Sequence, residues 1–409
     1  MKIILLHYSA PPVVGGVESV LGHQARLMAD AGHDVRIVAG RGMQTDGRVD
    51  FVKIAMADSR HPIVLSVKEK LDQGFVPEEF HALVEALANE LHTVVADADC
   101  LIAHNVCSLN KNLVLTAALK KVSEIKQRPQ LVLWHHDLAW TTPRYQDELH
   151  DGYPWDLLCK AWSGAEQVTI SEFRRRELAA LMGIPEERIS VIPNGVDAAR
   201  FLKLETLTSK LIEQMDLLNA SPILLLPVRI TSRKNIELAI QVMAELRQQA
   251  SQAKLVITGP LGPHNPANLH YFERLRALKN SLGLESVVHF LAEFIDEFLP
   301  DEVVSDFYRL ADALFLPSRE EGFGIPILEA GLTGIPIFCA DIPPLRDLGG
   351  TFVHYFSLEE NSQKIAAMIW KELSASSQAG FRSRVRSRYA WHQVYEQQIQ
   401  PLLEKVCNQ

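Results

Sequence analysis

The sequence predicts an α/β protein built from two doubly wound domains that face each other. Its 409 residues exceed one ordinary hydrophobic core and suit two domains of about 200 residues each. Short apolar runs alternate with longer amphipathic runs, which favours a parallel sheet covered by helices on both faces. This alternation occurs once in each half of the chain, and two copies of it predict two such domains.

The first half opens with the stretch KIILLHY at residues 2–8, whose nearly continuous apolar character is typical of a buried parallel strand. The turn SAPPVVGG follows, and then residues 17–32 show apolar positions at helical spacing and end at Gly32. Further buried strands of the first half are predicted at residues 34–40, 99–104, 130–136 and 167–171.

The second half repeats this order, with a strand at residues 222–228 and a helix at 235–249. The later elements are strands at 254–259, 287–291, 313–318 and 335–340, and a helix at 325–331. A turn-rich VIPNGVD separates the halves, so we expect one domain at residues 1–197 and the other at 198–388. The last helix, at about residues 389–409, is expected to return to the first domain.

Composition excludes several classes of protein. The hydrophobic content of 47% and the charged content of 22% are those of a globular chain. The net charge is −9 and neither half is basic, so we expect no nucleic-acid partner. Five scattered cysteines without a C-x-x-C pair indicate free thiols in a reducing compartment, with no zinc site. No apolar run approaches the ~20 residues of a membrane span, and the N-terminal run is too short for a signal peptide, so we expect a cytoplasmic protein.

Two cations follow the first strand of the second domain. Ligands of doubly wound sheets bind at the carboxyl ends of the strands. Arg229 comes directly after the strand at 222–228, and Lys234 opens the next helix. An arginine fork and a lysine point charge on one turn suit a diphosphate. The alternative is that RITSRK is an ordinary solvated loop.

A second turn, in PSREEGFGIPILEAG, joins a strand to a helix whose first residue is predicted to be Pro326. The backbone amides before that helix and its dipole would form an anion site. These amides belong to Gly322, Phe323, Gly324 and Ile325. Glu321 and Glu329 flank the turn, where their oxygens could accept hydrogen bonds from sugar hydroxyls. Together they predict a nucleotide-sugar site, unless both glutamates only complement the helix N-terminus.

These residues resemble a known family. EGFGIPILE matches the E-x7-E motif of retaining glycosyltransferases of family 4, and PPVVGGVE, ISEFRRREL, VIPNGVD, RITSRKN and WHQVYEQQI resemble other segments of that family in the same order. The resemblance implies the GT-B fold, which has two facing Rossmann-like domains and a C-terminal crossover helix. It also implies a nucleotide-diphosphate sugar as co-substrate, with no metal and no other cofactor.

The resemblance assigns roles to matching residues. Glu329 would hold the ribose, Glu321 the transferred sugar, and Arg229 with Lys234 the diphosphate. Gly15 and Gly16 would bring backbone amides of the first domain to the same phosphates when the domains close.

The first domain supplies a histidine candidate at the end of the strand at residues 130–136. His136 directly precedes Asp137, as in the family's His-Asp pair, and would contact the donor sugar or support the reacting centre. The alternative is a core histidine bonded to backbone. His104 ends an earlier strand and is a candidate on the acceptor side, as are Asp137 and Arg144. The aromatic segment around Arg144 is either an acceptor loop or an ordinary packed loop.

Two further patterns receive mainly structural interpretations. Asp97 and Asp99 form a D-x-D that precedes a buried strand instead of following one, so we regard it as coincidental. Residues 174–176 are three arginines, for which a solvated helix face is favoured over a site for a phosphorylated or lipid acceptor. Residues 260–273 depart from the family's short glycine loop near the expected base site, so the nucleotide stays open.

The function predicted from the sequence is transfer of a hexose, glucose or mannose, from a donor such as UDP-glucose or GDP-mannose to an acceptor hydroxyl with anomeric retention. The acceptor is expected to be a small soluble sugar or sugar acid. The alternatives are an epimerase or phosphorylase of the same fold, or a non-catalytic nucleotide-sugar-binding protein. The oligomeric state stays open.

Overall fold

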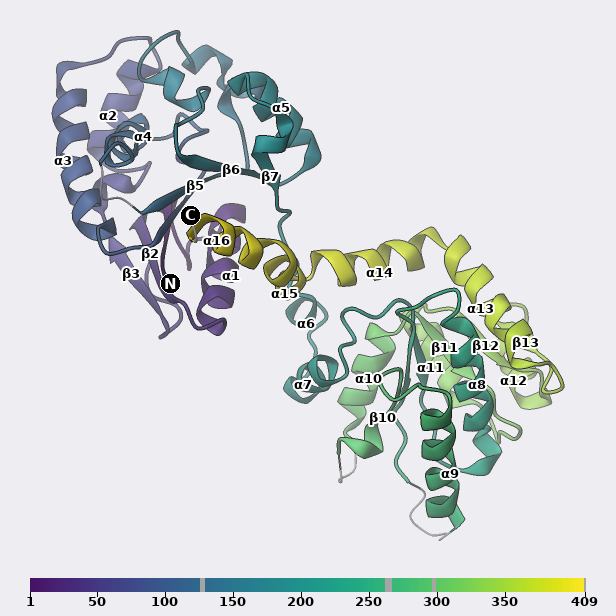
Figure 1. Ribbon diagram of the computed structural model, residues 1–409. Coiled ribbons are helices and arrows are strands. Elements are labelled where there is room, and N and C mark those ends of the chain that lie inside the picture. Colours follow the sequence, from purple (N-terminus) through teal and green to yellow (C-terminus); the bar gives the residue numbers. More distant parts are fainter. Residues whose placement is uncertain (126–128, 262–266, 296–298, 408–409) are drawn as a thin grey trace. The chain divides into compact units, whose positions relative to one another are not determined.

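The computed structural model describes residues 1–125, 129–261, 267–295 and 299–407, and the chain forms two compact units (Figure 1). Unit 1 comprises Met1–Gly195 together with the C-terminal segment Trp391–Gln409, and unit 2 comprises Val196–Ala390. Trp391 and Val394 of the returning segment are buried in the core of unit 1. The predicted C-terminal crossover helix is therefore confirmed.

Unit 1 is a seven-stranded parallel sheet in the order β3-β2-β1-β4-β5-β6-β7. Its strands are β1 (Lys2–Ser9), β2 (Asp34–Arg41), β3 (Val49–Lys53), β4 (Cys100–His104), β5 (Gln130–His135), β6 (Ala165–Thr169) and β7 (Ile189–Val191). Its helices are α1 (Gly16–Asp30), α2 (Pro62–Leu71), α3 (Glu78–Val95), α4 (Leu113–Val122), α5 (Glu172–Met182), α15 (Trp391–Val394) and α16 (Gln400–Cys407). Separate cores lie against the two faces of the sheet.

Unit 2 is a six-stranded parallel sheet in the order β10-β9-β8-β11-β12-β13. Its strands are β8 (Ile223–Leu226), β9 (Lys254–Ile257), β10 (Val288–Phe290), β11 (Ala313–Leu316), β12 (Ile337–Ala340) and β13 (His354–Phe356). Its helices are α6 (Ala198–Phe201), α7 (Thr206–Gln214), α8 (Ile236–Leu246), α9 (Ala267–Ser281), α10 (Asp301–Leu310), α11 (Ile325–Thr333), α12 (Pro343–Gly349), α13 (Ser362–Ala375) and α14 (Ser377–Tyr389). The predicted fold class of two doubly wound α/β domains is confirmed.

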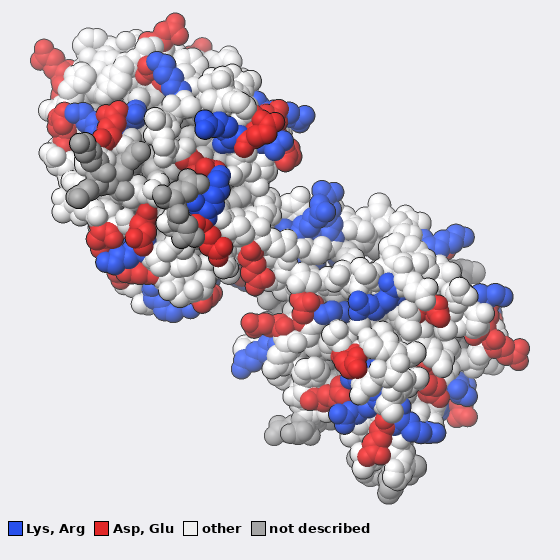
Figure 2. All heavy atoms as spheres, in the orientation of Figure 1, with Lys and Arg blue, Asp and Glu red and all other residues white. Residues whose placement is uncertain are grey.

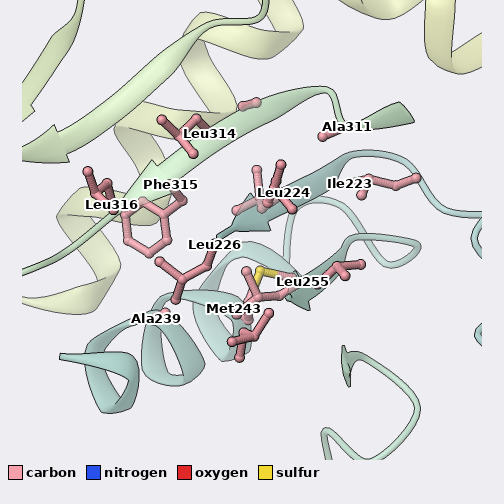
Figure 3. Packing of buried hydrophobic residues seen from close by; sticks show 14 of the residues in the cluster. Ile223, Leu224, Leu226, Ala239, Met243, Leu255, Ala311, Leu314, Phe315 and Leu316 are labelled. Atoms are coloured by element: carbon pink, nitrogen blue, oxygen red, sulfur yellow. The ribbon is translucent and has the colours of Figure 1, made fainter. Parts of the chain in front are cut away.

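The central strands of unit 2 are fully enclosed, which explains their unbroken apolar sequences. Leu224 and Leu226 of β8 pack with Leu314 and Leu316 of β11 in one cluster that also contains Met243 of α8 (Figure 3). All five side chains have no exposed surface. Because β8 and β11 are neighbours in this rigid core, the loops that leave their carboxyl ends start from fixed positions.

Three strands were not predicted from the sequence: β3, β7 and β13. Each lies at an edge of its sheet, has only three to five residues and is partly exposed. Because these three strands are short and partly exposed, they lack the continuous apolar run that identifies a buried parallel strand. Within the described ranges, no helix is long and apolar enough to cross a membrane.

Candidate functional site

The candidate donor site lies where the strand order of unit 2 reverses. The chain runs β8, β9, β10 toward one edge and then returns to β11 on the other side of β8, and such a switch point is where doubly wound sheets bind ligands. The two loops at this point are tied together. The amide of Arg319 donates to the carbonyl of Arg233 at 2.8 Å, and the Arg319 guanidinium donates to Oδ1 of Asn235 at 2.9 Å.

Lys234 and Glu321, predicted independently from two motifs, form an ion pair at this point. Lys234 Nζ lies 2.6 Å from Glu321 Oε1, and the two side chains are only 9% and 8% exposed. A buried charge without a partner is costly, so each side chain holds the other in place. The ammonium has three donors and the carboxylate accepts at several lone pairs, which leaves both groups able to bind a ligand as well.

The turn at residues 322–325 has the geometry of an anion site. Gly324 adopts φ 106°, and a Cβ there would lie 2.7 Å from Leu345 Cδ2, so glycine is required. The four amides of this turn donate no hydrogen bond to any other described residue. The helix α11 begins at Ile325, where the predicted range 325–331 begins, so Pro326 is its second residue and not its first. The amides and the helix dipole together favour a bound anion.

Glu329 is held by a residue that no sequence pattern indicated. The hydroxyl of Tyr308, on α10, donates to Glu329 Oε2. Burial and this hydrogen bond to the carboxylate raise the pKa of Tyr308 well above its usual value, so the hydroxyl stays a donor. Arg229 is an exposed residue of the loop that follows β8, and among the described residues it has no ion-pair partner. Of the departure noted at 260–273, residues 262–266 lie outside the described residues.

Three histidines gather at the corresponding reversal in unit 1, between β1 and β4. His7 Nδ1 lies 2.8 Å from the carbonyl oxygen of His104, and His104 Nδ1 lies 3.1 Å from His136 Nε2. His104 has no exposed surface and His136 is 5% exposed. Burial lowers the pKa of His136 to about 3 and that of His104 well below its usual value. The imidazole rings of His104 and His136 are therefore both neutral, and one ring donates a hydrogen bond to the other.

Asn105 positions the loop that carries His136 and Asp137. Its backbone is left-handed, with φ 57°, and its Oδ1 accepts hydrogen bonds from the amides of His136 at 2.8 Å and Asp137 at 3.1 Å. Asparagine tolerates this conformation better than most residues, but a single Asn after a strand is too common to be recognised as a site residue. The carboxylate of Asp137 lies 3.7 Å from Arg174 Nη2, whereas Arg176 of the same arginine run is exposed.

The other predicted residues of unit 1, Gly15, Gly16 and Arg144, belong to its described part and form no hydrogen bond with the three histidines. Gly15 caps α1 and Gly16 is its first residue, and a Cβ on Gly15 would lie 2.0 Å from Glu18 Oε2. Arg144 is exposed and stacks on the ring of Tyr145 at 4.7 Å.

The D-x-D carboxylates are already engaged by other groups. Asp97 pairs with Lys2 and Arg36, and Asp99 accepts from the Lys2 amide. Within the described part of the chain, no three His, Cys, Asp or Glu residues are grouped to hold a metal.

The buried histidines predict acid sensitivity. Burial lowers the pKa of His7 and of His135 to about 4, below the 6.5 of an exposed histidine. Between pH 6.5 and pH 4 the unfolded chain therefore binds more protons than the folded chain. The free energy of unfolding has its highest value above pH 6.5 and decreases as the pH falls toward 4. Each such histidine contributes a slope of about 1 kcal/mol per pH unit. Denaturant titrations at pH 7 and pH 5 measure this loss of unfolding free energy.

The variant His135→Gln tests this source of the slope. It removes one buried imidazole whose Nε2 lies 2.8 Å from Gln167 Oε1, and we expect a smaller loss of stability between pH 7 and pH 5 than in the wild type. The exposed His81, replaced by Gln, is the matched control. An unchanged slope in His135→Gln would contradict the assignment.

Comparison with known proteins follows the same two-part division. Residues 14–200 match the family model described as Glycosyltransferase Family 4, and residues 209–386 match the one described as Glycosyl transferases group 1. The chain is 25% identical to the mannosylglucosylglycerate synthase of Petrotoga mobilis and 23% identical to that of Thermotoga maritima, each over 84% of this chain and 83% of the relative. It is 24% identical to a GDP-mannose-dependent alpha-(1-6)-phosphatidylinositol monomannoside mannosyltransferase of Mycobacterium tuberculosis, over 83% of this chain and 80% of the relative.

Proposed function

Because the chain belongs to glycosyltransferase family 4, we propose that it moves a hexose from a nucleotide-diphosphate sugar to an acceptor hydroxyl with anomeric retention. The observation that carries the proposal is the buried Lys234–Glu321 pair beside the turn at residues 322–325. A cation, a carboxylate and four unengaged amides at one switch point match a pyrophosphate joined to a sugar.

The proposed chemistry stabilises the departing phosphate. Negative charge grows on the leaving pyrophosphate as the glycosidic bond breaks, and preplaced donors stabilise that charge more than the ground state. Lys234, Arg229 and the amides at 322–325 supply these donors, so the proposal includes no metal ion. Glu321 accepts from hydroxyls of the transferred hexose, and neutral His136 of unit 1 contributes a hydrogen bond to the reacting sugar.

For the acceptor, we propose a small soluble sugar or sugar acid. Support comes from the two mannosylglucosylglycerate synthases, whose names describe a sugar–glycerate product and whose similarity extends over most of this chain. The relative named for phosphatidylinositol monomannoside supplies the competing lipid acceptor for a test. Glucose and mannose are the proposed hexoses, with UDP-glucose or GDP-mannose as donor.

A thermal-shift panel followed by product analysis tests this function. The panel contains UDP, GDP and ADP, each with and without its sugar. The nucleotide that the chain uses should give the largest rise in melting temperature, because a ligand that binds only the folded chain raises its stability by mass action. The selected donor is then incubated with glycerate, glucosylglycerate or a phosphatidylinositol mannoside, and NMR identifies the anomer formed. Failure of all three nucleotides to stabilise the chain would remove the proposal. Conversion of donor without acceptor would indicate an epimerase, and a requirement for inorganic phosphate a phosphorylase.

The proposed ribose contact predicts a loss of hydroxyl recognition in Glu329→Ala. We expect its affinity for the selected nucleoside diphosphate to fall about 10-fold or more, because hydrogen bonds to a charged group contribute about 1.5–3 kcal/mol. The 2′,3′-dideoxy analogue should bind the wild type and Glu329→Ala equally well, and calorimetry measures all four affinities.

The control for this experiment is Glu320→Ala, which removes the same charge from the exposed start of the same turn and should leave both affinities unchanged. Tyr308→Phe should give a smaller loss than Glu329→Ala, since it releases the carboxylate without removing it. Retained discrimination between the two nucleotides in Glu329→Ala would refute the ribose role.

A further inference from the structure

A cavity of unit 2 opens at the amino ends of its central strands, whereas the turn at residues 322–325 follows the carboxyl end of β11. Its volume is about 460 Å³, within the range of small-molecule sites. Ser221 and Pro222 come just before β8, and Asp312 just before β11, so these lining residues mark the amino ends of the strands. Helices α13 and α14 form the other wall, joined at Ser376, whose hydroxyl caps α14. We propose that this cavity binds an organic phosphate that carries a flat ring.

The charge on α14 favours an anion. Arginines occupy alternate positions from Arg382 to Arg388, and Figure 2 shows Lys and Arg atoms gathered over this helix. Arg386 is buried and donates to both carboxylate oxygens of Asp312, at 3.1 and 2.6 Å, which neutralises that acid. Arg384 and Arg388 line the cavity four residues apart and therefore on one face of the helix. In the described ranges, neither has an acidic partner.

The rest of the lining suits the two parts of such a ligand. Ser383 Oγ donates to Ser221 Oγ at 2.5 Å, and Ser374 and Ser387 add further hydroxyls to the wall. Arginine forks bind phosphate oxygens in pairs, and hydroxyls complete their hydrogen bonds. The apolar wall comes from Trp370 with Leu373, Ala379 and Gly380. An indole face packs well against a flat ring, whereas a bare inorganic anion would leave this apolar wall without a contact.

Trp370 gives the experiment a local signal, because the other five tryptophans of the sequence all belong to unit 1. The full chain is labelled with 5-fluorotryptophan, and the ¹⁹F resonance of Trp370 is assigned by its loss in Trp370→Phe. AMP, inorganic phosphate and adenosine are the probes. We expect AMP to move this resonance saturably, inorganic phosphate to bind more weakly, and adenosine to give no saturation at the same concentrations.

Paired variants identify the binding groups. Arg384→Gln with Arg388→Gln should weaken AMP binding at least 10-fold, and both side chains are exposed, so the fold should persist. Lys210→Gln with Lys364→Gln removes the same charge from exposed positions outside the cavity and should leave the Kd unchanged. Arg229→Ala, at an exposed position of the proposed diphosphate site, should also leave it unchanged. The inference is overturned by the absence of an AMP-dependent shift, by its persistence in the arginine double variant, or by its loss in Arg229→Ala, which would place AMP in the proposed donor site.

Discussion

Replacing Lys234 with alanine is expected to lower turnover at saturating donor by 10²-fold or more, the scale of losing one preplaced transition-state donor. The ammonium is the buried cation at the switch point, 2.6 Å from Glu321. Its loss removes charge stabilisation of the leaving pyrophosphate and leaves the Glu321 carboxylate buried without a partner. The substitution should therefore also destabilise the chain, by about 3–5 kcal/mol at most for a broken buried pair. Steady-state kinetics and denaturant unfolding measure the two effects.

Two further variants separate the catalytic role of Lys234 from its structural one. Arg233→Ala removes an exposed cation from the same loop and should leave turnover near that of the wild type. Lys234→Ala combined with Glu321→Ala removes both buried charges, so it should recover stability relative to Lys234→Ala without recovering turnover. Recovery of both together would show that the turnover lost in Lys234→Ala came from the unpaired Glu321 carboxylate and that neither charge is needed for transfer, so the proposed role of Lys234 in the transition state would be wrong.

The residues of this pair could be predicted from the sequence, but their contact could not. Lys234 and Glu321 follow strands that are recognisable as continuous apolar runs, and each lies in a motif of characteristic spacing. They are 87 residues apart, however, and meet only because β11 returns to the free side of β8. Strand order is a tertiary property, since the alternation of strands and helices is the same for several orders.

Supporting residues were missed for a related reason. Tyr308 and Asn105 act through single hydrogen bonds to Glu329 and to the loop of His136. A tyrosine on an amphipathic helix and an asparagine after a strand are both common in ordinary packing. Local patterns therefore identified the groups proposed to touch the donor, whereas the groups that orient them become visible only when distant segments are packed together.

The second large effect is expected in unit 1, where His136→Ala should lower turnover by about 10-fold to 10²-fold while nucleoside diphosphate affinity changes less than twofold. The affinity should persist because His136 is proposed to contact the transferred sugar and is not among the residues proposed to hold the nucleotide. The pKa of His136, lowered by burial to about 3, makes the ring neutral throughout a pH 5.5–8 assay. His136 should therefore act by donating or accepting a hydrogen bond, and its protonation should not shape the rate–pH profile in that range.

His136→Gln distinguishes a hydrogen bond from proton transfer. A glutamine amide is neutral and can replace the ring as a hydrogen-bonding group, so this variant should recover part of the turnover lost in His136→Ala. If His136 were a general base, glutamine would be as inactive as alanine, because an amide does not accept a proton near neutral pH. His135→Gln is the matched control, since that ring is bonded to Gln167 instead of His104 and its loss should leave turnover nearly unchanged. Equal activity of His136→Ala and the wild type would return His136 to a purely structural role.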